Sequence, residues 1–328
     1  MDALLTDILD QPRALREALR AHRGLAPLLG PGDRRRVVLA GMGASHFAAY
    51  PAFLSLLRRG AAAVWIEAGE LLHFAPEALG PGTVAVLVSQ SGRSAEIMRL
   101  LEARRGAALV GVTNDPDSPL GRAADVCVPM HAGPEQAGVA TKTFTCSLLA
   151  LDLLAGGAAQ DWPGIADALE GVLERRGQWL PGLEAALGAT AHVWALGRGA
   201  ALAAALTCGL MLKEAGALHG EGLSVPQFRH GPLEAAGPGR SALLLTSPGA
   251  LGRLDLELAA EMAEAGMGVA ACTQPGQEAP PGVHGLPWPH PSPAVLVAAG
   301  QCLAHAAALR RGVRPGSFER VGKVTTRE

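Results

Sequence analysis

Short apolar runs alternate with helix-like segments along this chain, and the same plan occurs twice. The runs expected to form strands are 37–40, 63–66, 84–88, 109–113, 192–196, 243–246 and 269–272. Most of them end in a polar or glycine-containing turn, and a helix-like segment follows. Such alternation is typical of a parallel sheet that is covered by helices on both faces. The sequence therefore predicts an α/β chain with two parallel sheets in tandem.

The length of the chain fits this plan. A chain of 328 residues is long enough for two domains of about 150 residues each. The expected parts are an N-terminal helical lead (1–33), a first α/β domain (34–160), a helical linker (161–189), a second α/β domain (190–310) and a C-terminal tail (311–328). The segment 275–291 is rich in proline and glycine, and we expect it to be an irregular surface loop.

Charge and composition argue against several classes of function. The formal net charge is −2 and the pI is about 6.6, so the chain lacks the basic field with which proteins attract nucleic acids or anionic membranes. The sequence also shows no bilayer-spanning apolar run and no signal peptide. Its five cysteines are scattered and form no Cys-x-x-Cys pair. We expect a soluble cytoplasmic protein with reduced thiols that contacts neither nucleic acid nor membrane.

The segment from Ser89 to Ser94 carries the clearest chemical signal. It follows the apolar run 84–88 and precedes a helix-like segment, 95–104. A turn between a strand and a helix directs free backbone N–H groups and the positive end of the helix dipole to one point, and short hydroxyl side chains add donors. The predicted ligand is a phosphate group. The alternative is an ordinary serine-rich helix cap.

Other common site patterns are incomplete, so we predict neither a cofactor nor a metal. Gly41-Met42-Gly43 and Gly197-Arg198-Gly199 each close an apolar run, but His46 and Leu202 stand where the dinucleotide fingerprint requires its third glycine. His219-Gly220-Glu221 has the spacing of zinc deaminases without their Pro-Cys-x-x-Cys partner. A Gly-x-Ser-x-Gly elbow for a nucleophilic serine is also missing.

A set of ordered motifs resembles the sugar isomerase family, usually called SIS domains, and specifically the isomerase half of glucosamine-6-phosphate synthase and its stand-alone relatives. The motifs are Gly43-Ala44-Ser45, Ser89-Gln90-Ser91-Gly92, Asn114 to Leu120, Ala132-Gly133-Pro134-Glu135 through Thr141 to Phe144, Leu212-Lys213-Glu214 and His230-Gly231-Pro232-Leu233. The resemblance implies two tandem flavodoxin-like SIS domains, each a parallel sheet with helices on both faces. It also implies a homodimer in which the histidine of one subunit completes the site of the other.

The resemblance assigns the phosphate of a sugar substrate to five residues. It implies that Ser45, Ser89, Gln90, Ser91 and Ser94 bind this phosphate. This agrees with the anion site expected from the local chemistry of the strand-to-helix turn.

The resemblance also assigns catalytic roles to three residues. Glu214 matches the carboxylate that moves a proton between C1 and C2, His230 matches the histidine that assists ring opening, and Lys323 matches a tail lysine that approaches the sugar carbonyl. The tail 311–328 is accordingly expected to belong to the active site. From the residues alone, a surface glutamate of a helix is the favoured explanation of Glu214, and a hydrogen-bonded loop histidine explains His230 equally well.

Two departures from the synthases shape the expected activity. The synthases carry an N-terminal glutaminase whose cysteine follows the initiator methionine, whereas residue 2 here is Asp2, and only a short segment precedes the first strand. Thr207 and Met211 stand where the synthases have a glutamate and a lysine. We therefore expect an aminosugar-phosphate isomerase and deaminase that converts glucosamine 6-phosphate to fructose 6-phosphate and ammonia.

Two alternatives stay open from the sequence. The first is a deglycase or an aldose–ketose isomerase that acts on another phosphosugar. The second belongs to another class, a regulatory module that binds a phosphosugar, although the segment before the first strand is too short for a three-helix DNA-binding domain.

Overall fold

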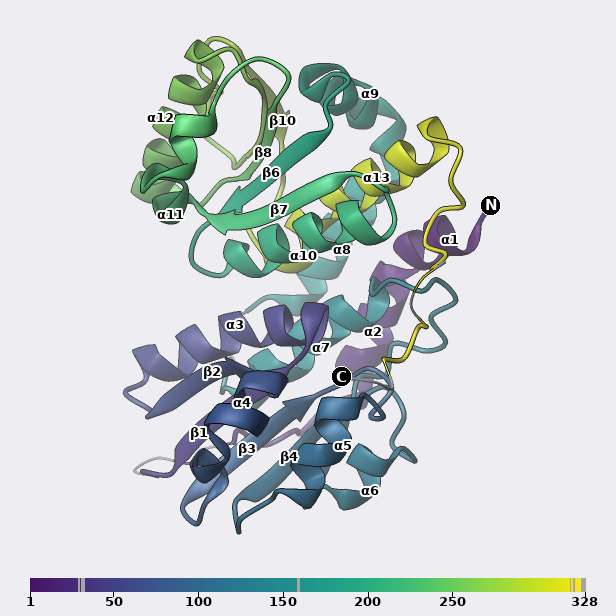
Figure 1. Cartoon of the computed structure of the whole chain (residues 1–328), viewed down its shortest axis with the longest axis vertical. Coiled ribbons are helices and arrows are strands. Elements are labelled where there is room, and N and C mark those ends of the chain that lie inside the picture. The colour runs from purple at the N-terminus through teal and green to yellow at the C-terminus, as the bar shows by residue number, and fades with distance from the viewer. Residues whose placement is uncertain (29, 31–32, 158–159, 319, 321, 326–328) are drawn as a thin grey trace. The chain divides into compact units, whose positions relative to one another are not determined.

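The chain folds into two compact units, each built around one parallel sheet (Figure 1). The computed structural model describes residues 1–328 except 29, 31–32, 158–159, 319, 321 and 326–328. The first-sheet unit consists of residues 13–162 and 318–328, and the second-sheet unit consists of residues 1–12 and 163–317. Both units therefore combine segments that are distant in the sequence.

The first-sheet unit has a five-stranded parallel sheet in the order β2-β1-β3-β4-β5. Its strands are β1 (Arg36–Gly41), β2 (Ala63–Glu67), β3 (Thr83–Val88), β4 (Ala108–Thr113) and β5 (Val126–Pro129). Its helices are α2 (Gln11–Ala21), α3 (Gly43–Arg58), α4 (Ala68–Phe74), the 3-10 helix η1 (Pro76–Leu79), α5 (Ala95–Glu102), α6 (Pro119–Ala123) and α7 (Lys142–Leu154). The helices α4, α5 and α6 share a buried apolar cluster with one face of the sheet, and α3 packs on β1 and α7.

The second-sheet unit has a five-stranded parallel sheet in the order β10-β9-β8-β6-β7. Its strands are β6 (His192–Gly197), β7 (His219–Ser224), β8 (Ser241–Leu245), β9 (Gly268–Thr273) and β10 (Val283–Pro287). Its helices are α1 (Ala3–Leu9), α8 (Trp162–Glu174), α9 (Arg176–Leu187), α10 (Ala201–Glu214), α11 (Val225–Arg229), the 3-10 helix η2 (Pro232–Ala235), α12 (Gly249–Glu264) and α13 (Pro293–Arg310). The segment 161–189, expected as a linker, forms α8 and α9, and residues 163–317 belong to one compact unit.

Both sheets have the same strand order when each is numbered from its own first strand. That order is 2-1-3-4-5, which is flavodoxin-like, so the predicted fold class of two tandem α/β domains is confirmed. In such a sheet the chain crosses from the second strand to the third over the first strand. Ligands bind outside the carboxyl ends of the strands at this point, here β1 and β3 in the first sheet and β6 and β8 in the second.

The strand β10 corrects one prediction. Residues 275–291 were expected to be an irregular loop, but Val283–Pro287 pair in parallel register with Val269–Thr273 of β9. The strand lies at the edge of the sheet, and its proline is its last residue, a position where the missing N–H removes no bond that the ladder needs. The prolines around β10 therefore mark its ends, and the prediction of irregular structure was wrong for residues 283–287.

The helix α13 is long and apolar, but it is a core element of its unit. By length and composition alone it could cross a membrane, and 83% of its apolar window is buried inside the structure. Burial in a core accounts for that composition, because a helix that is apolar on all sides needs neighbours on all sides.

Candidate functional site

The carboxyl ends of β1 and β3 bring together the residues predicted to bind phosphate. Gly41 and Val88, the last residues of these strands, are partners in the parallel register. A Cβ atom added to Gly41 would lie 2.9 Å from the Val88 carbonyl oxygen and 3.1 Å from the Ser45 carbonyl carbon. Ser45 in the first turn of α3 and the segment after β3 therefore meet at one edge of the sheet.

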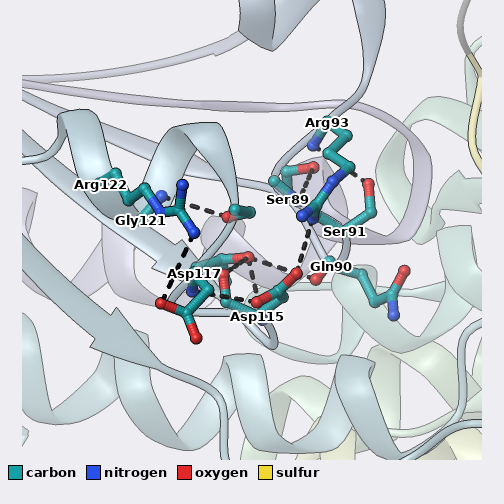
Figure 2. Close-up of polar contacts among 11 residues, drawn as sticks. Ser89, Gln90, Ser91, Arg93, Asp115, Asp117, Gly121 and Arg122 are labelled. Carbon is teal, nitrogen blue, oxygen red and sulfur yellow. Dashed lines mark hydrogen bonds and ion pairs between the residues drawn. The ribbon is translucent and has the colours of Figure 1, made fainter.

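The segment 89–94, which we call the serine loop, forms a tight turn before α5 (Figure 2). Gly92 has φ of +62°, and its N–H donates to both the carbonyl oxygen and Oγ of Ser89, each at 3.2 Å. A Cβ atom at Gly92 would stand 2.0 Å from Oγ of Ser118. Both the left-handed backbone and this close approach require glycine, which explains why this residue follows the serines.

The serine loop keeps several backbone donors unused. In the part of the chain that the structure describes, the N–H groups of Gln90, Ser91 and Ser94 donate to no other group. Ser94 is the N-cap of α5, and its side chain makes no capping hydrogen bond. Free N–H groups and a helix N-terminus at a strand end form a site with positive potential. The arrangement suits a phosphate group.

Neighbouring segments hold the serine loop in place. The Gln90 carbonyl accepts hydrogen bonds from the Asn114 N–H at 3.0 Å and the Thr113 hydroxyl at 3.3 Å, and the Gly92 carbonyl accepts from the Leu120 N–H at 3.3 Å. The Asn114 side chain in turn joins this loop to the segment after β5, because its Nδ2 donates to the Gly133 carbonyl at 2.9 Å. The unused donors are therefore fixed in direction before any ligand binds.

The C-terminal tail lies against the same unit. Lys323 Nζ donates to the backbone carbonyls of Glu135 and Ala137, the second at 2.7 Å. The Thr325 carbonyl accepts from the Ala95 N–H, in the first turn of α5, at 3.1 Å. The tail thus reaches the helix that follows the serine loop, and the Lys323 ammonium is bound to main-chain oxygens. A role for Lys323 at a sugar carbonyl stays a prediction.

Glu135 is a structural residue of this region whose role sequence reasoning missed. Its carboxylate accepts from the N–H and hydroxyl of Thr141, at 2.8 and 3.1 Å, and from the N–H and hydroxyl of Thr143, at 3.1 and 2.8 Å. It therefore satisfies donors at the start of α7 and fixes the segment that receives Lys323. The acidic residue ahead of two threonines was the available sequence signal.

Glu214 is a partly buried carboxylate at the last position of α10. It has no hydrogen-bond or ion-pair partner among the described residues. Burial raises the pKa of Glu214 to about 7, and the neighbouring Lys213 opposes this shift. Thr207 and Met211, which precede it by two turns and one turn on the same helix face, are fully buried. Glu214 can therefore hold or release a proton near neutral pH.

His230 lies on the other side of the second sheet from Glu214. It is the exposed C-cap residue that follows α11, and its ring has no partner within the described residues. The helices α11 and α12 share an apolar cluster with one sheet face, whereas α10 packs on the opposite face, where a Cβ at Gly222 would touch Leu206. The sheet thus separates Glu214 and His230 of one chain.

The corresponding edge of the second sheet is closed by an internal ion pair. Asp255 of α12 accepts from Nε of Arg198, in the turn after β6, at 2.5 Å and from the Ser247 N–H, after β8, at 2.9 Å. Side-chain exposure is only 16% for Arg198 and 1% for Asp255. A carboxylate of the protein therefore neutralises the donors there, and the anion site belongs to the first sheet.

Comparison with known proteins supports this interpretation of the fold. Residues 33–156 match the SIS domain family model. The chain is 31% identical over 360 aligned residues to an isomerising glutamine–fructose-6-phosphate aminotransferase from Symbiobacterium thermophilum, and the alignment covers 99% of this chain and 59% of that relative. In five aminotransferases of this name that align with the chain, the aligned part makes up 41% to 59% of the length of the relative.

Solved structures give the same result over nearly the whole chain. The C-terminal domain of glucosamine-fructose-6-phosphate aminotransferase from Francisella tularensis superimposes with a TM-score of 0.86 at 20% identity, covering 97% of this chain and 98% of that one. Glucosamine-6-phosphate deaminase from Thermotoga maritima superimposes with a TM-score of 0.80 at 21% identity, covering 98% and 99%. At these identities the likeness establishes the fold. The chain is therefore a SIS-domain protein with two tandem α/β domains.

Proposed function

We propose that this SIS-domain protein is a phosphosugar isomerase that binds the sugar phosphate in the serine loop and moves a proton with Glu214. The observation that carries the proposal is the set of unused N–H donors at Gln90, Ser91 and Ser94, at the carboxyl edge of β1 and β3. A phosphate bound there satisfies these donors and the N-terminal dipole of α5. Ser45 and Ser89 contribute hydroxyl groups at the same edge.

The proposed reaction is deamination of an aminosugar phosphate, most concretely glucosamine 6-phosphate. His230 assists ring opening, and Glu214 takes the proton from C2 of the open-chain aldehyde and delivers it to C1 of the enolamine that forms. The resulting imine at C2 is hydrolysed by water, which releases fructose 6-phosphate and ammonia. A carboxyl group with a pKa near 7 suits this task, because it accepts and returns the proton with small cost in either direction.

The choice of an aminosugar rests on the named relatives. Aminotransferases that isomerise fructose 6-phosphate align with this chain, and a glucosamine-6-phosphate deaminase shares its fold. A tagatose-6-phosphate ketose/aldose isomerase from Escherichia coli has the same fold with a TM-score of 0.84. Ammonia distinguishes the two reactions, because simple aldose–ketose isomerisation forms a ketose phosphate without it.

The proposed active unit is a homodimer with shared sites. Glu214 and His230 lie on elements that cover opposite faces of the second sheet. A site that uses both residues is therefore more easily built when His230 comes from a second copy of the chain. Two-fold dimers are the commonest form of assembly and would supply two equivalent sites of this kind.

Replacement of Ser89 and Ser91 together by alanine should raise KM for a phosphorylated sugar and change kcat less. Each lost hydrogen bond to a charged group costs roughly 1.5 to 3 kcal/mol. Steady-state kinetics with glucosamine 6-phosphate and with unphosphorylated glucosamine measure this effect. Ser55→Ala, on α3 of the same unit, is the matched control and should leave KM unchanged. Equal activity of the wild-type protein on both sugars would contradict the phosphate site.

A further inference from the structure

Arg93 is a basic side chain of the serine loop with unused donors. Its Nη1 donates to the Ser91 carbonyl at 2.9 Å and to Oδ2 of Asp115 at 2.6 Å (Figure 2). Its Nε and Nη2 donate to no other described residue. A guanidinium has five N–H donors in a planar fork, so Arg93 keeps enough of them to bind an oxyanion at two points.

The ion pair between Arg93 and Asp115 is one that a ligand can replace. The side chains of Arg93 and Asp115 are 46% and 42% exposed, and ion pairs with such exposure contribute little to stability. Asp115 does not depend on Arg93 for its position, because its Oδ1 also accepts from the Asp117 N–H at 3.0 Å. The guanidinium can therefore leave Asp115 while the loop around Asp115 stays in place.

Arg93 belongs to the loop that carries the unused N–H donors, and its guanidinium bonds to the main chain of that loop at Ser91. It stands between Ser91 and Ser94, whose N–H groups are both unused, and its own N–H donates to Oγ of Ser91 at 3.2 Å. Arg93 also holds the pKa of Asp115 below its usual value, so this carboxylate stays charged at neutral pH. A phosphate that approaches the serine loop meets one movable cation and one fixed anion.

We propose that Arg93 is a phosphate-binding residue that exchanges its bond to Asp115 for one to the phosphate dianion of the substrate. The inference rests on the proposed function and deepens it. A dianion attracts the guanidinium more strongly than one carboxylate does. An unphosphorylated sugar carries no charge that could replace Asp115 as the partner of the guanidinium. The Arg93–Asp115 pair thereby favours phosphorylated over neutral sugars.

The test is a double-mutant cycle on binding, which needs no turnover. Calorimetry with inorganic phosphate and with fructose 6-phosphate gives Kd for wild type, Arg93→Ala, Asp115→Asn and the double variant. Loss of a charge-assisted hydrogen bond predicts about 10-fold weaker binding for Arg93→Ala. Loss of the competing carboxylate predicts up to about 5-fold tighter binding for Asp115→Asn. In the double variant, binding should be about as weak as in Arg93→Ala, and so up to about 50-fold weaker than in Asp115→Asn, because without Arg93 there is no guanidinium for which Asp115 competes.

Arg122→Ala is the matched control, because Arg122 pairs with Asp117 at 3.9 Å in the neighbouring loop and both side chains are highly exposed. This variant should bind phosphate as wild type does. Wild-type affinity in the double variant would overturn the inference, because Arg93 would then act only by neutralising the negative charge of Asp115, without binding the phosphate itself. An equal loss of phosphate affinity in Arg122→Ala would overturn the inference too, because any positive charge near the loop would then have the same effect.

The inference and the proposed function fail in different ways. Turnover of a phosphosugar by the wild-type protein, together with unchanged Kd values in Arg93→Ala, overturns the role of Arg93 alone. Phosphate affinity that depends on Arg93, without turnover of any phosphosugar, supports the role of Arg93 and overturns the proposed reaction.

Discussion

Glu214→Gln should lower kcat by about 100-fold or more while the affinity for phosphosugar stays close to that of wild type. The amide keeps the shape of the side chain but cannot accept the C2 proton, and Glu214 lies in a different unit from the serine loop. Kinetics and calorimetry with the same phosphosugar separate the two effects. Glu264→Gln is the control, because Glu264 ends α12 as Glu214 ends α10. Activity near that of wild type would remove Glu214 from the mechanism.

The same variant should be more stable than the wild type at alkaline pH. The pKa of Glu214 is raised from 4.5 to about 7, so between these values the folded state holds a proton that the unfolded state releases. The free energy of unfolding of the wild type therefore falls as pH rises through this window, by about 1 to 3 kcal/mol after allowance for partial exposure. Urea unfolding at pH 8 should give a higher free energy of unfolding for the variant than for the wild type. At pH 4.5 this difference should nearly vanish. Equal stabilities at pH 8 would contradict the unpaired, partly buried carboxylate.

A mixture of His230→Ala and Glu214→Gln subunits should regain activity although each variant alone is inactive. If His230 acts in the partner's site, a mixed dimer has one site with both groups intact. Random exchange of equal amounts makes half of the dimers mixed, so about a quarter of wild-type activity is expected. Differently tagged subunits allow the mixed dimers to be isolated and assayed. Isolated mixed dimers without activity would show that His230 does not serve the partner's site.

The central strands were visible in the sequence because burial on both faces makes them continuous apolar runs, as in Val84 to Val88. Of the edge strands, β2 was predicted, whereas β5, β7 and β10 were not. β7 has the sequence HGEGLS, in which glycines allow α10 to approach closely, since a Cβ at Gly222 would stand 2.4 Å from Cα of Leu206. Neither its composition nor its periodicity is typical of a strand. β10 was hidden by the prolines around it.

The candidate site was predictable where its chemistry is local. The serine loop follows from a buried strand, a glycine and a following helix, and these are neighbours in the sequence. Arg93 and Asp115 are 22 residues apart, and their contact exists only because β3 and β4 are adjacent in the sheet. The raised pKa of Glu214 likewise depends on burial at the end of α10. Tertiary packing, which no local pattern encodes, supplies these features.

The most direct test of the proposed function is incubation of the wild-type protein with glucosamine 6-phosphate in D₂O. Ammonia, fructose 6-phosphate and carbon-bound deuterium are measured together by enzymatic assay and NMR. The proposed reaction predicts equal amounts of ammonia and ketose phosphate, with deuterium at C1 of the product and at C2 of the remaining substrate. It also predicts that unphosphorylated glucosamine gives neither product nor exchange. Folded protein that leaves glucosamine 6-phosphate and a panel of other aldose and ketose phosphates unconverted, without exchange at C1 or C2, would contradict it.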